Sequence, residues 1–244
     1  MKNHCKLVVC LMLSLFTFLF LSTEGMANDL NLIEKTALVV TDPQNDFLSP
    51  TGVAWPLVKD SVDEHNTIEN IETLLKTAKE QKVLVFISPH FYYPYDQKWG
   101  FTGKIETWMH KHNMYLRMGP LTLGGFKDSG ADFLERYKPY IYDNNTVITS
   151  PHKVYGPESN DLVLQLRKRN INHVILAGMS ANLCVESHMR ELIEQGFKVT
   201  VVSDATAAAK MGELDGYSAA LTNFKMIAND VVTTEEAIEI FTDK

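Results

Sequence analysis

One cysteine stands where a strand-like run of residues meets a helix-like run. The stretch "GMSANLCVESHMRELIEQGF", residues 178–197, follows the apolar run "HVILAG" and contains Cys184. With a helix beginning near Leu183, the thiol would lie at the helix amino end, where the dipole and free N–H groups favour a thiolate. The expected buried stripe of this helix leaves Cys184 beside the strand end. The position predicts a nucleophile, and the alternative is a small buried hydrophobe.

Polar residues follow three other apolar runs that are typical of strands. The run "TALVV" reads as a strand that ends at Asp42, His90 follows "VLVFIS", and Lys153 follows "TVITS". In open parallel sheets, ligands bind beyond the carboxyl ends of the strands. We therefore expect Asp42 to accept the thiol proton and Lys153 to place a cation beside the thiolate. The alternatives are a turn-capping aspartate and a solvated lysine. His188 is expected at the surface or behind the catalytic groups.

Three longer segments carry a family resemblance. "LVVTDPQNDF", "HKVYGPESNDLVLQLRKRNINHVILAGMSANLCVESHMRE" and "GFKVTVVSDATAA" resemble the isochorismatase-like cysteine hydrolases, a group with nicotinamidases, N-carbamoylsarcosine amidohydrolases and ureide or biuret hydrolases. The resemblance implies a catalytic triad of Asp42, Lys153 and Cys184. It also implies a cis peptide bond between Met179 and Ser180, and an oxyanion hole formed by the N–H groups of Ser180 and Cys184. Members of the group are commonly dimers or tetramers, so a homo-oligomer is expected.

The resemblance implies cleavage of a small amide or ureido C–N bond through a cysteine thioester, with ammonia release. Aromatic residues and one histidine are expected to enclose a compact planar substrate: Phe47, His90, Tyr93 and Trp99. Isochorismatase-type activity, nicotinamidase activity and a catalytically silent binding protein of the same fold remain as alternatives.

No metal or other cofactor is expected. Nicotinamidases of this group bind a divalent metal through an Asp-x-His sequence after the second strand, whereas this chain has Ser88-Pro89-His90 there. His110 and His112 in "MHKHN" form a pattern that is normally an exposed polar turn.

Strand-like runs alternate with amphipathic stretches along the chain. Strands are expected at residues 36–40, 83–88, 146–150, 173–178, 198–204 and 226–230, and helices at 61–82, 158–170, 213–224 and from 184 and 234 onward. This order predicts an α/β fold, a Rossmann-like three-layer sandwich with a mainly parallel sheet of about six strands and helices on both faces. The aromatic-rich segment 89–130 is expected to be a long loop that serves as a lid, an oligomer contact or a small satellite core.

The first 27 residues differ from the rest of the chain. Lys2 and Lys6 precede a long apolar run that ends in the small-residue sequence "GMAN", which is typical of a cleaved signal peptide. We expect a mature single domain of residues 28–244, exported to the periplasm or secreted, without membrane contact after cleavage. A membrane anchor is the alternative. The formal net charge of −7 argues against a nucleic-acid partner and leaves a small molecule as the expected one.

Overall fold

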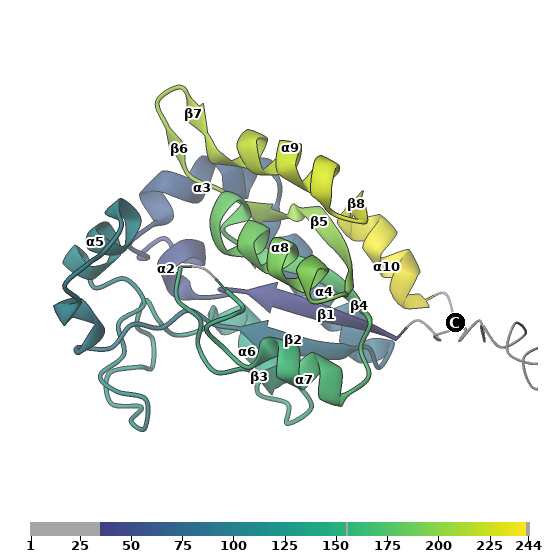
Figure 1. Ribbon diagram of the computed structural model, residues 1–244, viewed down its shortest axis with the longest axis horizontal. Coiled ribbons are helices and arrows are strands. Elements are labelled where there is room, and N and C mark those ends of the chain that lie inside the picture. Colours follow the sequence, from purple (N-terminus) through teal and green to yellow (C-terminus); the bar gives the residue numbers. More distant parts are fainter. Residues whose placement is uncertain (1–34, 155, 243–244) are drawn as a thin grey trace, which may run out of the picture. The chain divides into compact units, whose positions relative to one another are not determined.

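The described part of the chain, residues 35–154 and 156–242 of the computed structural model, is built on one six-stranded parallel sheet. Its strand order is β3-β2-β1-β4-β5-β8 (Figure 1). The strands are β1 (Thr36–Thr41), β2 (Leu84–Ser88), β3 (Val147–Ile148), β4 (His173–Met179), β5 (Lys198–Ala207) and β8 (Asp230–Val232). The expected α/β fold with a parallel sheet is confirmed.

Helices cover both faces of the sheet because the central strands are apolar on both sides. Every residue of β4 and all but the first of β1 are buried, as expected where a parallel sheet is covered on two faces. One core contains alternate β1 residues, Leu38 and Val40, with apolar residues of α3 (Trp55–Glu64), α4 (Thr67–Glu80) and α10 (Thr234–Thr242). The other contains Ala37 and Val39 with residues of α7 (Leu162–Lys168), α8 (Glu186–Glu194) and α9 (Gly216–Ile227).

The remaining elements are short. They are α2 (Asn45–Leu48), α5 (Lys104–Lys111), α6 (Lys138–Ile141), the 3-10 turns η1 (Asp96–Lys98) and η2 (Glu135–Tyr137), the π-helical turn η3 (Ala181–Val185), and an antiparallel hairpin of β6 (Lys210–Met211) and β7 (Leu214–Asp215).

Several expected bounds differ from the structure: the helix expected at 158–170 covers Leu162–Lys168, the strand expected at 146–150 covers Val147–Ile148, and the helix expected at 213–224 begins at Gly216. Three larger differences follow. The segment 61–82 is not one helix, because Asn66 adopts a left-handed conformation with φ of 50° between α3 and α4. The last strand begins at Asp230, since α9 continues through Met226 and Ile227. The segment 89–130 was expected to be a loop, but it contains the helix α5. The apolar side of α5 packs Met109 into the core.

No helix within residues 35–154 or 156–242 has the length and apolar character needed to cross a membrane. The expected signal peptide, residues 1–27, lies outside the described residues, as does the expected mature start at Asn28.

Candidate active site

The site lies at the carboxyl ends of two adjacent central strands. Strands β1 and β4 pair in parallel up to Thr41 and Gly178, so the residues that follow them emerge side by side. Asp42 comes directly after β1, and its N–H donates to the carbonyl of Ser88 at the end of β2. Cys184 lies in η3, immediately after β4. The predicted pairing of Asp42 with Cys184 at one edge of the sheet is therefore what the topology provides.

The thiol of Cys184 is almost completely buried, with 1% of the residue exposed. Its Sγ lies 3.4 Å from the carbonyl oxygen of Val154, and the N–H groups of Ser180 and Cys184 itself are directed toward the sulfur. Burial raises the pKa of the Cys184 thiol well above its usual value, and the negative charge of Asp42 raises it further. Burial therefore opposes the thiolate that the two N–H groups at the helix end favour.

The main-chain turn before Cys184 has the expected form. The peptide bond between Met179 and Ser180 is cis, as the family resemblance implied. The N–H groups of Ser180 and Cys184 both face Sγ, which places two donors beside any carbonyl carbon that the sulfur could attack.

His152 is the side chain that contacts Asp42 most closely. Its Nε2 lies 2.7 Å from Oδ1 of Asp42, and its Nδ1 contacts the carbonyl oxygen of Lys153. A carbonyl can only accept, so Nδ1 carries a proton, and Nε2 shares its proton with the carboxylate. Burial by itself lowers the pKa of His152, but the charge and hydrogen bond of Asp42 and the carbonyl of Lys153 outweigh it and raise the pKa.

Lys153 points away from this pair. Its Nζ donates to Oδ2 of Asp96 at 2.6 Å and to the carbonyl of Phe91 at 2.7 Å, above the rings of Tyr92 and Tyr93. His90 and His152 form an isolated parallel bridge beyond β2 and β3, shifted by one residue from the register of those strands. Side chains alternate between faces in extended backbone, so a chain that turns His152 toward Asp42 turns Lys153 the other way. The structure brings His152, and not Lys153, against Asp42.

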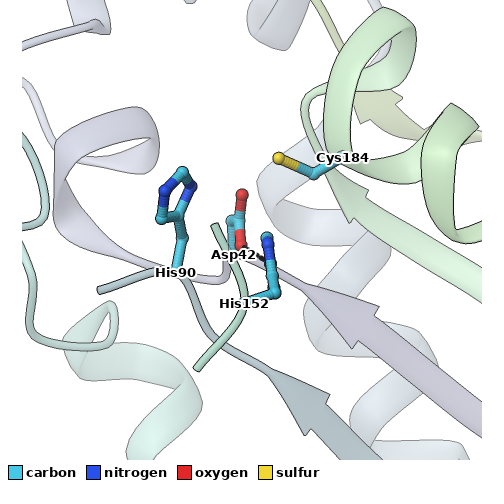
Figure 2. Close-up of side chains that lie close together, drawn as sticks. All are labelled: Asp42, His90, His152 and Cys184. Carbon is cyan, nitrogen blue, oxygen red and sulfur yellow. Dashed lines mark hydrogen bonds and ion pairs between the residues drawn. The ribbon is translucent and has the colours of Figure 1, made fainter. Parts of the chain in front are cut away.

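His90 completes the cluster of polar side chains. Ligand-capable atoms of Asp42, His90, His152 and Cys184 all lie within 4.8 Å of one another, and all four residues are buried. Figure 2 shows the side chains converging on one space, with the sulfur of Cys184 directed toward Asp42 and His90 across from it. Burial, together with the nearby charges of His152 and Lys153, lowers the pKa of His90 well below its usual value.

Several buried polar atoms around this space have no hydrogen-bond partner within residues 35–154 and 156–242. They are Oδ2 of Asp42, both ring nitrogens of His90 and the hydroxyl oxygens of Tyr92 and Tyr115. The rings of Tyr92 and Tyr115 each lie 4.7 Å from the ring of His90. Buried polar atoms rarely remain unpaired, so their concentration indicates a place for a polar molecule.

The other expected substrate residues lie at different distances from this space. Phe47 packs edge-on against Tyr115, with 5.7 Å between ring centroids, and lines an apolar hollow beside Ser180. Tyr93 packs in a small cluster with Phe91. Trp99 packs against Tyr92 at the edge of the loop and is 36% exposed.

His188 and His112 bond to backbone carbonyls, whereas Nε2 of His110 is buried without a hydrogen-bond partner among the described residues. His188 is fully buried, so the surface alternative is wrong: its Nδ1 donates to the carbonyl of Cys184 at 2.6 Å and its Nε2 lies 2.8 Å from Oγ of Ser88. Ser88 is thereby occupied and does not replace the missing metal-binding carboxylate. His110 stacks edge-on with Tyr92, and the ring of His112 contacts the carbonyl of Trp108.

Sequence reasoning missed His152, Asp96 and Tyr115. His152 is adjacent to Lys153 in the sequence, so its position after the third strand could have identified it. Tyr115 carried no local signal, because it reaches the site through a left-handed conformation with φ of 57° and a backbone hydrogen bond to Asp46.

Two curated proteins are similar to this chain in sequence. The ureidoacrylate amidohydrolase RutB of Variovorax paradoxus is 25% identical over 211 residues, which are 84% of this chain and 81% of that protein. RutB of Caulobacter segnis is 27% identical over 209 residues, 83% of this chain and 84% of that protein.

Solved structures share the fold. A cysteine hydrolase from Pseudomonas syringae pv. phaseolicola superimposes with a TM-score of 0.69 at 25% identity, covering 85% of this chain and 92% of that one. An N-carbamoylsarcosine amidase from Thermoplasma acidophilum gives a TM-score of 0.61 at 21% identity, covering 82% and 97%. The family model described as "Isochorismatase domain" matches residues 36–236, so this chain belongs to the isochorismatase family.

Proposed function

We propose that this protein is a cysteine hydrolase that cleaves the C–N bond of a small amide or ureide, with Cys184 as nucleophile, Asp42 as acid and base, and His152 as the cation that orients Asp42. The observation that carries the proposal is the convergence of these three buried groups at the ends of β1, β3 and β4, within 4.8 Å of one another. The names of the RutB relatives and of the N-carbamoylsarcosine amidase support the bond type.

Acylation begins from a neutral thiol. Because burial and Asp42 raise the pKa of Cys184, the S–H proton passes to Asp42 as the sulfur attacks the carbonyl carbon. The N–H groups of Ser180 and Cys184 stabilise the oxyanion of the tetrahedral intermediate. Asp42 then donates its proton to the nitrogen, the C–N bond breaks, and the amine leaves a thioester on Cys184.

Deacylation reverses the roles. A water molecule attacks the thioester carbon while Asp42 takes its proton, and the S–C bond then breaks as Asp42 returns that proton to sulfur. The imidazolium of His152 holds Oδ1 of Asp42 at 2.7 Å through both steps, which leaves Oδ2 free for the proton transfers.

Two parts of the site limit the size and polarity of the substrate. The unpaired atoms of His90, Tyr92 and Tyr115 suit a compact polar group such as an amide or ureido group. Beside Ser180, the hollow lined by Phe47, Ala54, Leu57, Val58, Ile105, Trp108, Met109, Met114, Leu183 and Ala209 is apolar and contains no charged side chain. The substituent that occupies this hollow is therefore small and uncharged.

Ammonia release from a panel of small amides and ureides tests the proposal. The panel pairs each neutral compound with a carboxylate-bearing analogue, and the expected result is turnover that favours the neutral member and disappears in Cys184→Ala. Cleavage of an ester or vinyl ether with no ammonia from any amide would favour a different reaction of the same fold.

A further inference from the structure

The four-residue cluster of Asp42, His90, His152 and Cys184 combines one carboxylate, two imidazoles and one thiol. These are the side chains that bind Zn²⁺ in proteins, and four of them satisfy its preferred coordination number. Their ligand-capable atoms lie within 4.8 Å of one another. In a tetrahedral zinc site with bonds of about 2.0–2.3 Å, ligand atoms lie roughly 3.3–3.8 Å apart, so contraction by about 1 Å would form the site.

The cluster has unused binding capacity. His90 is 0% exposed, yet neither of its ring nitrogens has a hydrogen-bond partner within the described ranges. Oδ2 of Asp42 is likewise buried and has no hydrogen-bond partner within these ranges. Sγ of Cys184 lies 3.4 Å from the carbonyl oxygen of Val154, which is a long contact. Each of these atoms could bind a metal without breaking an existing strong hydrogen bond.

His152 is oriented as a metal-bound histidine usually is. Its Nδ1 is held by the carbonyl of Lys153, and this fixes the ring so that Nε2 faces the cluster. Metal-binding histidines commonly donate their second ring nitrogen to a backbone carbonyl or a carboxylate. A metal would replace the proton that Nε2 now shares with Asp42, and the carboxylate would bind through Oδ2.

We infer that Asp42, His90, His152 and Cys184 form a binding site for a Zn²⁺-class ion, and that bound metal reversibly inhibits the chain's thiol chemistry. Binding replaces the protons on Sγ and Nε2, which pass to solvent. The sulfur lone pair and the carboxylate are then held by the metal, so neither the nucleophile nor its base is free to react. The metal binding does not depend on the proposed hydrolysis, whereas its inhibitory consequence for turnover does.

Zinc alone is the probe. The purified protein is titrated with Zn²⁺ in competition with a chromophoric chelator, and Cys184 alkylation by iodoacetamide is measured with and without the metal. Expected are one equivalent bound per chain, loss of alkylation with zinc, and full recovery after chelation. Co²⁺ should give a thiolate-to-metal charge-transfer band that is absent in Cys184→Ser.

Two further variants separate this site from adventitious binding. His90→Gln retains the other three ligands and should weaken zinc binding by about tenfold or more. His112→Gln removes an exposed histidine outside the cluster and should bind zinc as the natural protein does. Circular dichroism of each variant confirms that it is folded.

The outcomes are distinguishable from those of the proposed function. Zinc affinity that is unchanged in both Cys184→Ser and His90→Gln, or alkylation that zinc does not slow, would overturn the metal site even if amides are hydrolysed. Stoichiometric zinc binding with no amide turnover would support the site and contradict the hydrolase proposal instead.

Discussion

The carboxylate of Asp42 lies 2.7 Å from Nε2 of His152, while the neighbouring Lys153 is bonded to Asp96. The basic side chain against Asp42 is thus an imidazole, where the family resemblance implied an ammonium. Nδ1 of His152 is fixed by the carbonyl of Lys153, so the ring cannot turn away from Asp42 without losing that hydrogen bond. The lysine serves a different contact, joining the third strand end to the loop that holds Asp96.

Replacement of the thiol should remove covalent chemistry. Cys184→Ala is expected to lower kcat by at least about 10³-fold, and Cys184→Ser nearly as much, because a carboxylate is too weak a base for an alcohol. Steady-state ammonia release measures the effect, and thermal unfolding shows whether the fold is retained. Substantial activity in Cys184→Ala would exclude the thioester route.

Substitution of His152 should mainly lower kcat, whereas substitution of Lys153 should mainly lower the free energy of unfolding. His152→Gln is expected to lower kcat by about 10²–10⁴-fold, since it removes the charge that orients Asp42. Lys153→Met is expected to change kcat by less than about tenfold and to lower the free energy of unfolding by roughly 1–3 kcal/mol, because the buried carboxylate of Asp96 then keeps the N–H of Tyr93 but loses its cation. Kinetics and denaturant unfolding of both variants provide the measurement. A kcat loss in Lys153→Met as large as in His152→Gln would restore the lysine to the catalytic triad.

Asp42 and His152 should act as one unit. Asp42→Asn alone is expected to remove most of the activity, and addition of His152→Gln should reduce kcat/KM little further. A double-mutant cycle on kcat/KM measures the coupling. Additive losses would show that the two residues assist separate steps.

The stability of the fold should fall below about pH 6.5 through His188. Burial, followed by the charge of His152, lowers the pKa of His188 well below its usual value. In the unfolded chain His188 takes up a proton near pH 6.5, whereas in the folded chain its lowered pKa keeps it neutral. The stability that the neutral His188 contributes is therefore complete above that pH and is lost as the pH falls. His90 acts in the same sense, and His152, with its raised pKa, in the opposite one.

His188→Asn keeps a donor near the carbonyl of Cys184 and removes the titration. Its free energy of unfolding, measured by denaturant from roughly pH 5 to 8, should depend less on pH than that of the natural protein, by up to about 1.4 kcal/mol per pH unit. His112→Asn, at an exposed position, is the control and should leave the slope unchanged. Equal slopes in His188→Asn and the natural protein would mean that His188 is protonated in the folded state.

Export is the remaining expectation, and it rests on the sequence alone. Protein produced in an export-competent host should begin at or near Asn28 and be recovered outside the cytoplasm. N-terminal sequencing of each cell fraction measures this. An intact leader in the membrane fraction would favour an anchor.

The sequence alone determined the sheet and the meeting of Asp42 with Cys184 at its edge. Apolar runs such as "LVVT" and "HVILAGM" can be covered only by packing on both faces, so they form central parallel strands, and Asp42 and Cys184 follow such strands directly. Their meeting at one edge of the sheet then follows from the parallel arrangement.

Tertiary structure decided whether His152 or Lys153 meets Asp42, and it decided the direction in which the pKa of the Cys184 thiol is shifted. Strand β3 is only two residues long and ends at Ile148, so no apolar alternation extends to residues 152 and 153, and a shift of one residue exchanges the faces of the two side chains. The bridge between His90 and His152, shifted by one residue from the register of β2 with β3, settles that choice. The raised pKa of Cys184 also depends on burial beneath segments distant in sequence, because desolvation comes from the whole surrounding fold and not from the helix end that local sequence indicates.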